Sequence, residues 1–295
     1  MRKIIHDCDC TFGIYGCDVD DGLALLYLLG DPQAEVLAVT TTYGNSTLEK
    51  VYPNTKKFLK DIGREEIPVF KGGSNPQDLD NEASYYLARM AEEHAGELEL
   101  LVTGSVTNLY GAWQCNPDFF HQVKRIVMMG GITEELIFAK RKMDELNFSC
   151  DSKAAYAVLT SEAQVAVITG NNCLKVLFTR DEYDRELADE SKAVVKFIRQ
   201  ETDYWFDNNM EEYGIPGYYN WDVIAAAYML HPELFETENT EFCLAVKDLE
   251  MGKLTICEEG KENNATIEIP VIKDAEEFRR NIYDTWKNVE FCLEK

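Results

Sequence analysis

Short runs rich in apolar and β-branched residues alternate along the chain with segments whose apolar positions follow a helical period. Strand-like runs occupy residues 2–9, 35–43, 67–70, 98–104, 125–131 and 163–170. The helical segments between them are residues 22–29, 46–62, 82–94 and 107–114. This alternation predicts an α/β fold with a mostly parallel open sheet flanked by helices, and we expect one domain over residues 1–295.

Two stretches depart from this alternation. Residues 134–149 (EELIFAKRKMDELNFS) predict an inserted irregular or hairpin element. The last hundred residues combine a charged helix, a Trp/Tyr-rich stretch and three strand-like runs, FCLAV, KLTICEE and TIEIPVI.

Polar residues follow four of the predicted strands. They are Asp7 and Asp9, residues 42–45, residues 103–108, and the Met129-Gly130-Gly131 triplet. The carboxyl ends of parallel strands meet at one edge of a sheet, where open α/β folds bind their ligands. We therefore expect a binding site at this edge.

The charge balance narrows the class of partner. Asp and Glu number 53 against 29 Lys and Arg, giving a formal net charge of −24. Nucleic acids and anionic membranes reward clustered positive charge, so both are disfavoured. A neutral or cationic small molecule fits better.

The nine cysteines are scattered and form no CxxC pair, which favours reduced thiols in the cytoplasm. The amino terminus, MRKIIHDCDC, lacks the apolar region of a signal peptide, and no run reaches the length of a membrane span. The sequence thus predicts a soluble cytoplasmic protein.

Five aspartates crowd into residues 7–21, and three explanations are open. Asp18, Asp20 and Asp21 suit a helix amino terminus, but this accounts for only part of the cluster. The segment DCDCT after a strand resembles the DxDxT motif of haloacid dehalogenase-like phosphatases, although the later strand ends lack the acids that complete a magnesium site. The third explanation comes from the whole chain.

Six segments in order carry recognisable motifs: the aspartates with GLAL, TTTYGN before LEK, GSVTN, IVMMGG, DELNFSCDSKAA and NWDVIAAAYMLHPELF. They resemble the DxDPGxDDAxAL, TTxxGNxxLEK, GPLTN, strand-MGG, EFNxxxDPxAA and HDxxAxxxLxxPxLF motifs of the nucleoside hydrolases, also called inosine-uridine nucleoside N-ribohydrolases. Because these segments extend over roughly the whole chain, the ordered set is specific although each motif alone is weak.

This resemblance implies a Ca²⁺-dependent hydrolase that cleaves the N-glycosidic bond of purine or pyrimidine ribonucleosides to ribose and free base. It places the Ca²⁺ site at Asp9, Asp21, the main-chain carbonyl of Thr107 and Asp222, with Asp7 beside them. Asp9 would also take the proton of the attacking water. The ribose-binding positions that it implies are Asp20, Asn45, Met129, Glu145 and Asn147. It further implies a homodimer or homotetramer.

The chain departs from the family on the side of the nucleobase. The histidine that precedes the last calcium aspartate in many members, and that is thought to protonate the departing base, is replaced by Trp221. Indole does not ionise usefully near neutral pH. We expect Trp221, Tyr213 and Tyr218 to bind the base by stacking, beside an inserted loop at residues 10–17. A ribosyl-binding protein with weak or lost catalysis is the alternative.

Overall fold

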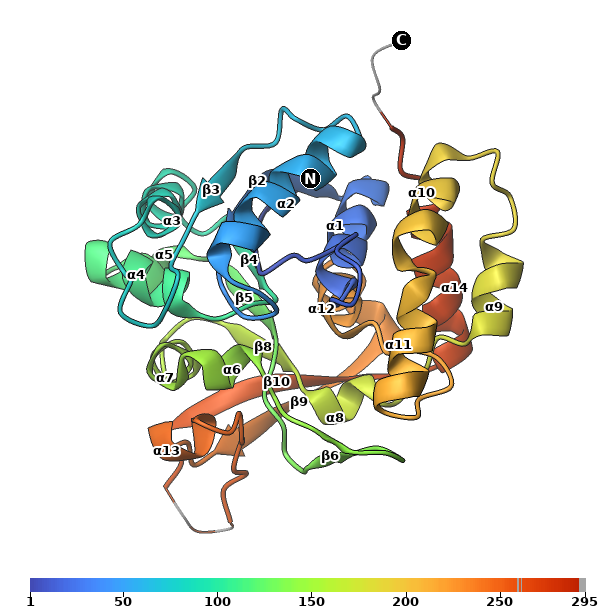
Figure 1. Ribbon diagram of the computed structural model, residues 1–295. Helices are drawn as coiled ribbons and strands as arrows, with labels where there is room; N and C mark the ends of the chain where they lie inside the picture. The colour runs from blue at the N-terminus through green and yellow to red at the C-terminus, as the bar shows by residue number, and fades with distance from the viewer. Residues whose placement is uncertain (259, 261, 292–295) are drawn as a thin grey trace.

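A single mixed sheet forms the centre of the molecule in the computed structural model, which describes residues 1–258, 260 and 262–291 (Figure 1). Its eight strands follow the order β3-β2-β1-β4-β5-β8-β10-β9. The strands are β1 (Arg2–Cys8), β2 (Ala34–Thr41), β3 (Val69–Lys71), β4 (Leu98–Val102), β5 (Arg125–Met129), β8 (Val165–Ile168), β9 (Phe235–Phe242) and β10 (Ala265–Ile272). All neighbours pair in parallel except β9 and β10, which confirms the predicted mostly parallel α/β sheet.

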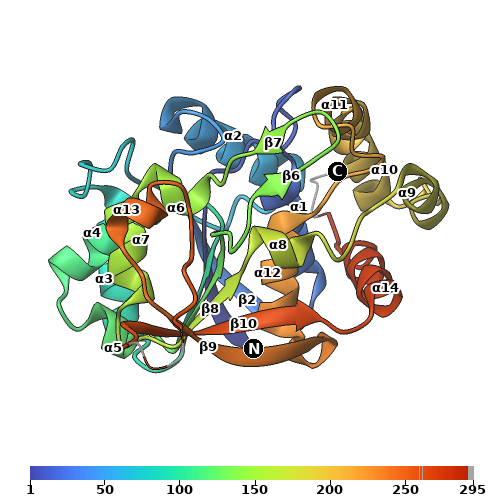
Figure 2. The same cartoon turned by 90° about the horizontal axis from the view of Figure 1, so that it is seen from below.

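Helices cover both faces of this sheet, as Figures 1 and 2 show. Helices α1 (Asp20–Gly30), α12 (Trp221–Leu230) and α14 (Ala275–Trp286) enclose one core, and α3 (Glu82–Glu93), α4 (Thr107–Cys115) and α7 (Ser152–Leu159) enclose the other. The remaining helices are α2 (Leu48–Asp61), α5 (Phe119–Gln122), α6 (Asn147–Cys150), α8 (Gly170–Cys173), α9 (Arg180–Glu186), α10 (Ala193–Thr202), α11 (Tyr204–Glu212), α13 (Val246–Leu249) and the 3₁₀ turn η1 (Pro232–Leu234).

Strand β1 shows why the sequence builds two cores. Successive side chains of a strand point to opposite faces. Ile4 and Cys8 lie in the core under α1, whereas Ile5 lies in the core on the α3 and α4 side. Both faces are therefore apolar, which is typical of a parallel sheet covered on both sides.

The inserted element is a hairpin, as predicted. Strands β6 (Leu136–Ile137) and β7 (Lys142–Met143) pair in antiparallel fashion and form their own small sheet. Figure 2 shows this hairpin beyond the main sheet, near α8 and α11. The hairpin thus lies close enough to the predicted site at the sheet edge to contribute residues to it.

Two of the three predicted strands near the carboxyl terminus are wrong. TIEIPVI lies in β10, but FCLAV forms only the end of β9 and the start of α13, and residues 253–258 of KLTICEE make only isolated bridges; its residue 259 lies outside the described residues. Asn264 explains the first difference. Its side chain bonds the backbone N–H and C=O of Leu244, which a neighbouring strand would otherwise pair.

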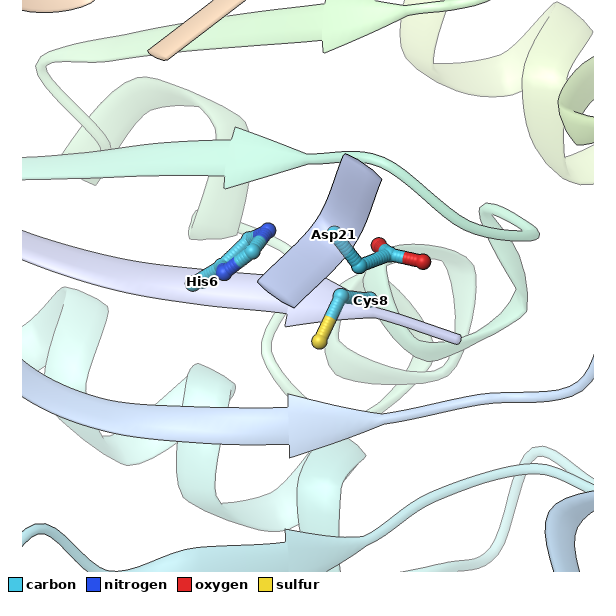
Figure 3. A group of neighbouring side chains, drawn as sticks. All are labelled: His6, Cys8 and Asp21. Atoms are coloured by element: carbon cyan, nitrogen blue, oxygen red, sulfur yellow. The ribbon is translucent and has the colours of Figure 1, made fainter. Parts of the chain in front are cut away.

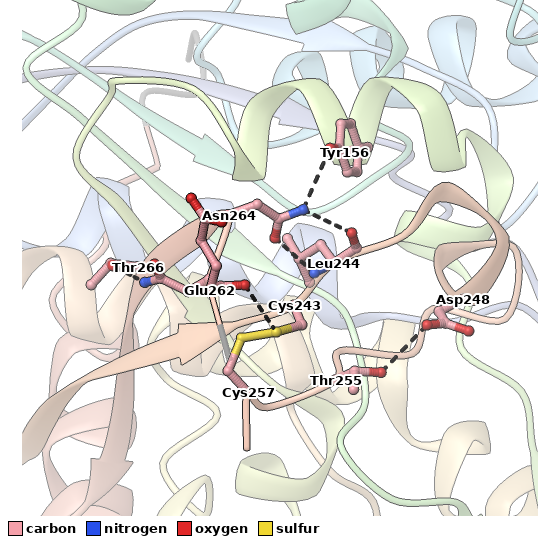
Figure 4. Close-up of a disulfide and its surroundings, with 10 residues drawn as sticks. Tyr156, Cys243, Leu244, Asp248, Thr255, Cys257, Glu262, Asn264 and Thr266 are labelled. Atoms are coloured by element: carbon pink, nitrogen blue, oxygen red, sulfur yellow. Dashed lines mark hydrogen bonds between the residues drawn. A yellow bond between two sulfur atoms is a disulfide. The ribbon is translucent and has the colours of Figure 1, made fainter. Parts of the chain in front are cut away.

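Cys243 and Cys257 form a disulfide that ties this region together (Figure 4). The prediction of reduced thiols is therefore wrong for this pair. Six of the other cysteines are free, and Cys292 lies outside the described residues. Compositional scatter could not reveal the pair, because it joins two loops that only the fold brings together.

No helix in the described parts of the chain has the length and apolar character needed to cross a bilayer.

Candidate active site

The floor of the candidate site is built from four neighbouring strand ends. Asp9 follows β1, Asn45 lies in the loop after β2, Thr103 follows β4, and Met129 is the last residue of β5. Since these strands are adjacent in the sheet order, their carboxyl ends bring the four residues to one edge.

The amino termini of α1 and α12 add three buried carboxylates. Asp20 and Asp21 begin α1, and Asp222 lies in the first turn of α12, which packs against α1. One carboxylate oxygen from each of the three lies within 4.8 Å of the others. The backbone N–H of Asp222 donates to Asp20 Oδ2 at 3.4 Å, joining the two helix termini. The positive ends of both helix dipoles favour acids here.

A chain of two hydrogen bonds fixes Asp21. Thr103 Oγ1 donates to Asp21 Oδ1 at 2.7 Å and lies 2.8 Å from Nε2 of His6. Because the Thr103 proton is directed at Asp21, the hydroxyl accepts from His6 Nε2–H. Complete burial lowers the pKa of His6 to about 3, so its imidazole is neutral. Thr103 therefore couples β1 and β4 to the first turn of α1.

His6, Cys8 and Asp21 also approach one another within 4.8 Å (Figure 3). His6 and Cys8 project from β1 toward α1, where Asp21 lies. Burial raises the pKa of the Cys8 thiol well above its usual value, and a thiol binds metal only as thiolate. The carboxylate cluster is the better metal site, because all of its donors are hard oxygens.

Asn45 connects Asp9 to this cluster. Its backbone N–H donates to Asp9 Oδ2, and its side-chain amide lies 3.4 Å from both Asp9 Oδ1 and Asp21 Oδ2. The preceding turn requires glycine, since a Cβ on Gly44 would lie 2.0 Å from Asp9 Oδ2. The Gly44-Asn45 pair after β2 thus places the main chain directly against the buried carboxylate of Asp9.

The electrostatics of the site call for a cation. Burial raises the pKa of Asp9, Asp20, Asp21 and Asp222, and repulsion among the neighbouring carboxylates raises it further. Several buried carboxylates cannot all ionise at this distance without shared protons or a compensating charge. A hard divalent cation fits both the oxygen donors and the charge.

A cavity of about 200 Å³ opens beside these carboxylates. The strand ends and Asp20 and Asp222 form one side of it. Helix α11 and the hairpin region form the other side. Trp205 of α11, Tyr213 directly after it and Trp221 at the start of α12 add half-buried aromatic side chains to the lining. We call these three aromatic residues the aromatic wall.

Most of the predicted binding residues reach this cavity. Asp9 and Asp21 are fully buried beside it and contact Asn45, which lines it. The predicted residues that line it are Asp20, Asn45, Met129, Glu145, Asn147, Tyr213, Trp221 and Asp222.

Asp7 does not reach the cavity. Its carboxylate accepts hydrogen bonds from Thr40 at 2.6 Å and from Asn108 of α4 at 2.8 Å, and burial raises its pKa to about 7. Because side chains alternate along a strand, Asp7 faces α4 while His6 and Cys8 face α1. It joins the sheet to α4 instead of holding the metal.

Thr107 is buried at the first position of α4, and its hydroxyl donates to Asp151 at 2.7 Å. The predicted Ca²⁺ ligand is its main-chain carbonyl, which this side-chain bond does not involve. Thr103, which precedes that helix, lines the cavity.

Tyr218 belongs to the core, not to the aromatic wall. Its side chain is 1% exposed, and its ring contacts those of Phe178 and Phe206 with centroid distances of 6.2 and 4.7 Å. The prediction that it binds the base is therefore wrong.

Glu145 lines the cavity but is occupied by backbone. Its carboxylate accepts N–H bonds from Gly131, Phe148 and Ser149 at 2.8 to 3.0 Å. Asn147 donates from its side-chain amide to the carbonyl of Met129 at 3.0 Å. Together these bonds hold the segment after the hairpin against the end of β5.

Several polar and aromatic lining residues had no predicted binding role, among them Asp18, Thr103, Asp144, Trp205, Asn209 and Glu212. Thr103 occupies the same position after β4 as Asp9 does after β1, and this shared position was the available signal. Asp18 was attributed to helix capping, although α1 begins only at Asp20.

A sequence model of the family described as "inosine-uridine preferring nucleoside hydrolase" matches residues 4–280. The chain belongs to this nucleoside hydrolase family. It is 26% identical over 285 residues to the inosine-uridine preferring nucleoside hydrolase of Crithidia fasciculata, covering 86% of each chain. It is also 26% identical over 248 residues to probable uridine nucleosidase 1 of Oryza sativa subsp. japonica, covering 74% of this chain and 75% of that protein.

Among solved structures, a plant nucleoside hydrolase superposes with a TM-score of 0.84 and 21% identity, over 97% of this chain and 99% of that one. This likeness shows the nucleoside hydrolase fold. Membership of the family supports hydrolysis of ribonucleoside N-glycosidic bonds as the activity, and the family is in general metal-dependent. The phosphatase alternative is not supported, because Asp7, the first aspartate of DxDxT, faces away from the cavity.

Proposed function

We propose that the protein is a Ca²⁺-dependent ribohydrolase that cleaves purine or pyrimidine ribonucleosides to ribose and free base, with Asp9 as the base that activates water. The observation that carries this proposal is the group of buried carboxylates at the strand ends, set beside a cavity of about 200 Å³. Single-residue roles within the site are part of the proposal.

The residues that would hold Ca²⁺ are Asp9, Asp21 and Asp222, together with the main-chain carbonyl of Thr107. All supply hard oxygen donors. When bound, the ion would offset the clustered negative charge and make a water molecule more acidic. The buried position of Asp9, next to Asn45 and Asp21, supports its role as the acceptor of the water's proton.

The remaining lining residues would bind and polarise the sugar. Asp20, Asn45 and Asn147 offer polar groups for the ribose hydroxyls from the floor of the cavity. As the glycosidic bond lengthens, positive charge develops on the sugar in an oxocarbenium-like transition state. Carboxylates fixed around this point stabilise that charge more than they stabilise the neutral ribose.

A ribosyl-binding protein with weak or lost catalysis is the second candidate. The observation that favours it is the absence of any histidine among the described residues that line the cavity. A neutral base leaves as an anion unless its nitrogen is protonated, and an imidazole is the side chain best suited to do this near neutral pH.

Substitution of Asp222 tests the proposal. Asp222→Asn should lower the bound Ca²⁺, measured by elemental analysis, and reduce kcat/KM for uridine and inosine by about 100-fold, since it removes one charged metal ligand. Asp118→Asn, at an exposed aspartate, is the matched control and should retain both. Full metal occupancy in Asp222→Asn would contradict the metal site, and ribose binding without turnover in the parent protein would favour the binding protein.

The proposal also includes the setting in which the protein acts. We propose one domain over residues 1–295, a cytoplasmic location and, on the family resemblance, a homodimer or homotetramer. The six free thiols support the location. The Cys243–Cys257 disulfide is unusual for a reducing compartment, so the redox state of this pair in cells tests the proposed cytoplasmic location.

A further inference from the structure

We infer that the cavity prefers ribosides whose base carries a permanent positive charge, such as N-ribosylated pyridinium compounds, over neutral nucleosides. This inference rests on the proposed N-ribohydrolase function and specifies its substrate class. It concerns the aromatic wall, where the base would lie, and not the carboxylates at the metal site.

The charges on this side of the cavity are negative. Asp18 and Asp144 line it, and among the described lining residues there is no lysine, arginine or histidine. Asp18 is half-buried and accepts hydrogen bonds from the N–H of Val19, at 2.7 Å, and from Asp20. Glu212 also lines the cavity, but Arg141 pairs with it at 2.6 Å, so it contributes little free charge.

The aromatic side chains suit a flat cation. Trp205, Tyr213 and Trp221 are half-buried and line the cavity together. The face of an aromatic ring attracts a cation, and tryptophan does so most strongly. Tyr213 already makes such a contact, because the guanidinium of Arg141 lies 5.3 Å from the centre of its ring. Two indoles and a carboxylate from Asp18 remain for a bound base.

Bond cleavage in a cationic riboside needs no acid from the protein. When its C1′–N bond breaks, the bonding electrons move to the positively charged nitrogen, and the base leaves as a neutral molecule. The oxygen of water bonds to C1′, and one proton of that water passes to Asp9 and then to solvent. A neutral nucleoside sends the same electron pair to an uncharged nitrogen, which must gain a proton. The lining lacks the imidazole that would supply it.

The charge of the whole chain acts in the same direction. A net charge of −24 raises the local concentration of small cations around the protein, most strongly at low ionic strength. Negative charge on the protein therefore attracts a cationic riboside at long range and also favours its binding at the aromatic wall.

The test compares two molecules of nearly the same shape. N-ribosylnicotinamide is cationic, and its 1,4-dihydro form is neutral. We expect the cationic form to bind at least about tenfold more tightly by competition against uridine hydrolysis, with a preference that falls as salt is added. We also expect it to be cleaved to nicotinamide and ribose. Equal or weaker binding of the cation overturns the inference, whereas failure to cleave any riboside, uridine and inosine included, overturns the proposed function.

One variant assigns the preference to the aromatic wall. Asp18→Asn keeps the shape of the side chain and removes its charge, and it should reduce the ratio of cation to neutral affinity by about fivefold or more. Asp118→Asn removes the same charge at an exposed site and should leave the ratio unchanged. A ratio preserved in Asp18→Asn would refute the role of this carboxylate.

Discussion

Single side chains at the strand ends determine whether the site is assembled. Asp21 carries a buried carboxylate that receives its best-placed hydrogen bond from Thr103, and that hydroxyl is in turn held by His6. Partners that orient metal-binding side chains contribute to affinity although they need not touch the ion. Thr103, which orients Asp21, can therefore be recognised in the sequence by its position directly after strand β4.

Substitution of Thr103 tests its role in orienting Asp21. Thr103→Val removes the donor to Asp21 and should weaken Ca²⁺ binding by about tenfold or more, measured by calorimetric titration. Thr107→Val is the control, because it removes the bond to Asp151 but keeps the main-chain carbonyl, so the Ca²⁺ affinity should stay within about twofold of the parent. Equal affinities in the two variants would contradict the role of Thr103.

Some of the site residues could be predicted from the sequence and others could not. Asp20 and Asp21 were predictable because several acids in one turn require an unusual environment, whereas Asp222 was predicted only through the family resemblance. The burial of Tyr218 was not predictable, since it and Trp221 are near neighbours in one aromatic segment. Tyr218 enters the core because its bridge to Phe178 sets its ring against that of Phe178, forty positions away.

At the scale of elements, the inserted loop at residues 10–17 is an ordered part of the site's border. Tyr204 of α11 donates its hydroxyl to the carbonyls of Ile14 and Cys17 at 2.9 and 3.0 Å. Tyr15 of the loop packs on the same ring, with centroids 5.0 Å apart. The loop therefore connects α11, which carries Trp205 of the aromatic wall, to Asp18 and the start of α1.

Removing the Tyr204 hydroxyl should loosen this connection. Tyr204→Phe keeps the ring contact but removes the hydroxyl that bonds the carbonyls of Ile14 and Cys17, so we expect KM for a riboside to rise about threefold or more with little change in bound metal. Tyr15→Phe is the control, because its ring contact remains and it is largely exposed. We also expect faster proteolysis of the loop in Tyr204→Phe, but not in Tyr15→Phe. Identical KM values in both variants would contradict this role.

The strands and helices of the parallel part of the sheet were predictable because apolar periodicity specifies them. The six predicted strands and four predicted helices all occur in the structure. The prediction fails in the segment after β9, where Asn264 and the disulfide substitute for strand pairing. Local sequence cannot show this, because the side chain that completes the backbone bonds of Leu244 lies twenty residues away.

In the whole molecule, the Cys243–Cys257 disulfide closes a loop that does not itself line the cavity but packs behind it, since Leu254 donates its N–H to the carbonyl of the lining residue Ile132. The two cysteines are 14 residues apart in the sequence, and closing such a loop restricts the unfolded chain. In the chain-entropy model this is worth about 3 kcal/mol. Asn264, beside the pair, also contacts the hydroxyl of Tyr156 on α7 at 3.4 Å.

Removal of the disulfide should therefore lower stability without altering the site. The double variant Cys243→Ser/Cys257→Ser should melt several degrees lower by calorimetry, with kcat/KM for a riboside within about twofold of the parent. Cys115→Ser, at an exposed free thiol, should leave the Tm unchanged. An unchanged Tm in the double variant would show that the pair carries no stability.

The sheet ends at β9, and this strand limits how copies of the chain can meet. Its outward residues include Glu236, Glu238 and Glu241, all exposed. Unpaired strand edges invite a strand from another molecule, and charged side chains discourage it. Two copies joined edge to edge at β9 would bring rows of glutamates together. We therefore expect the proposed homodimer or homotetramer to assemble through a surface other than this edge, and the same glutamates protect the protein against fibre-like aggregation.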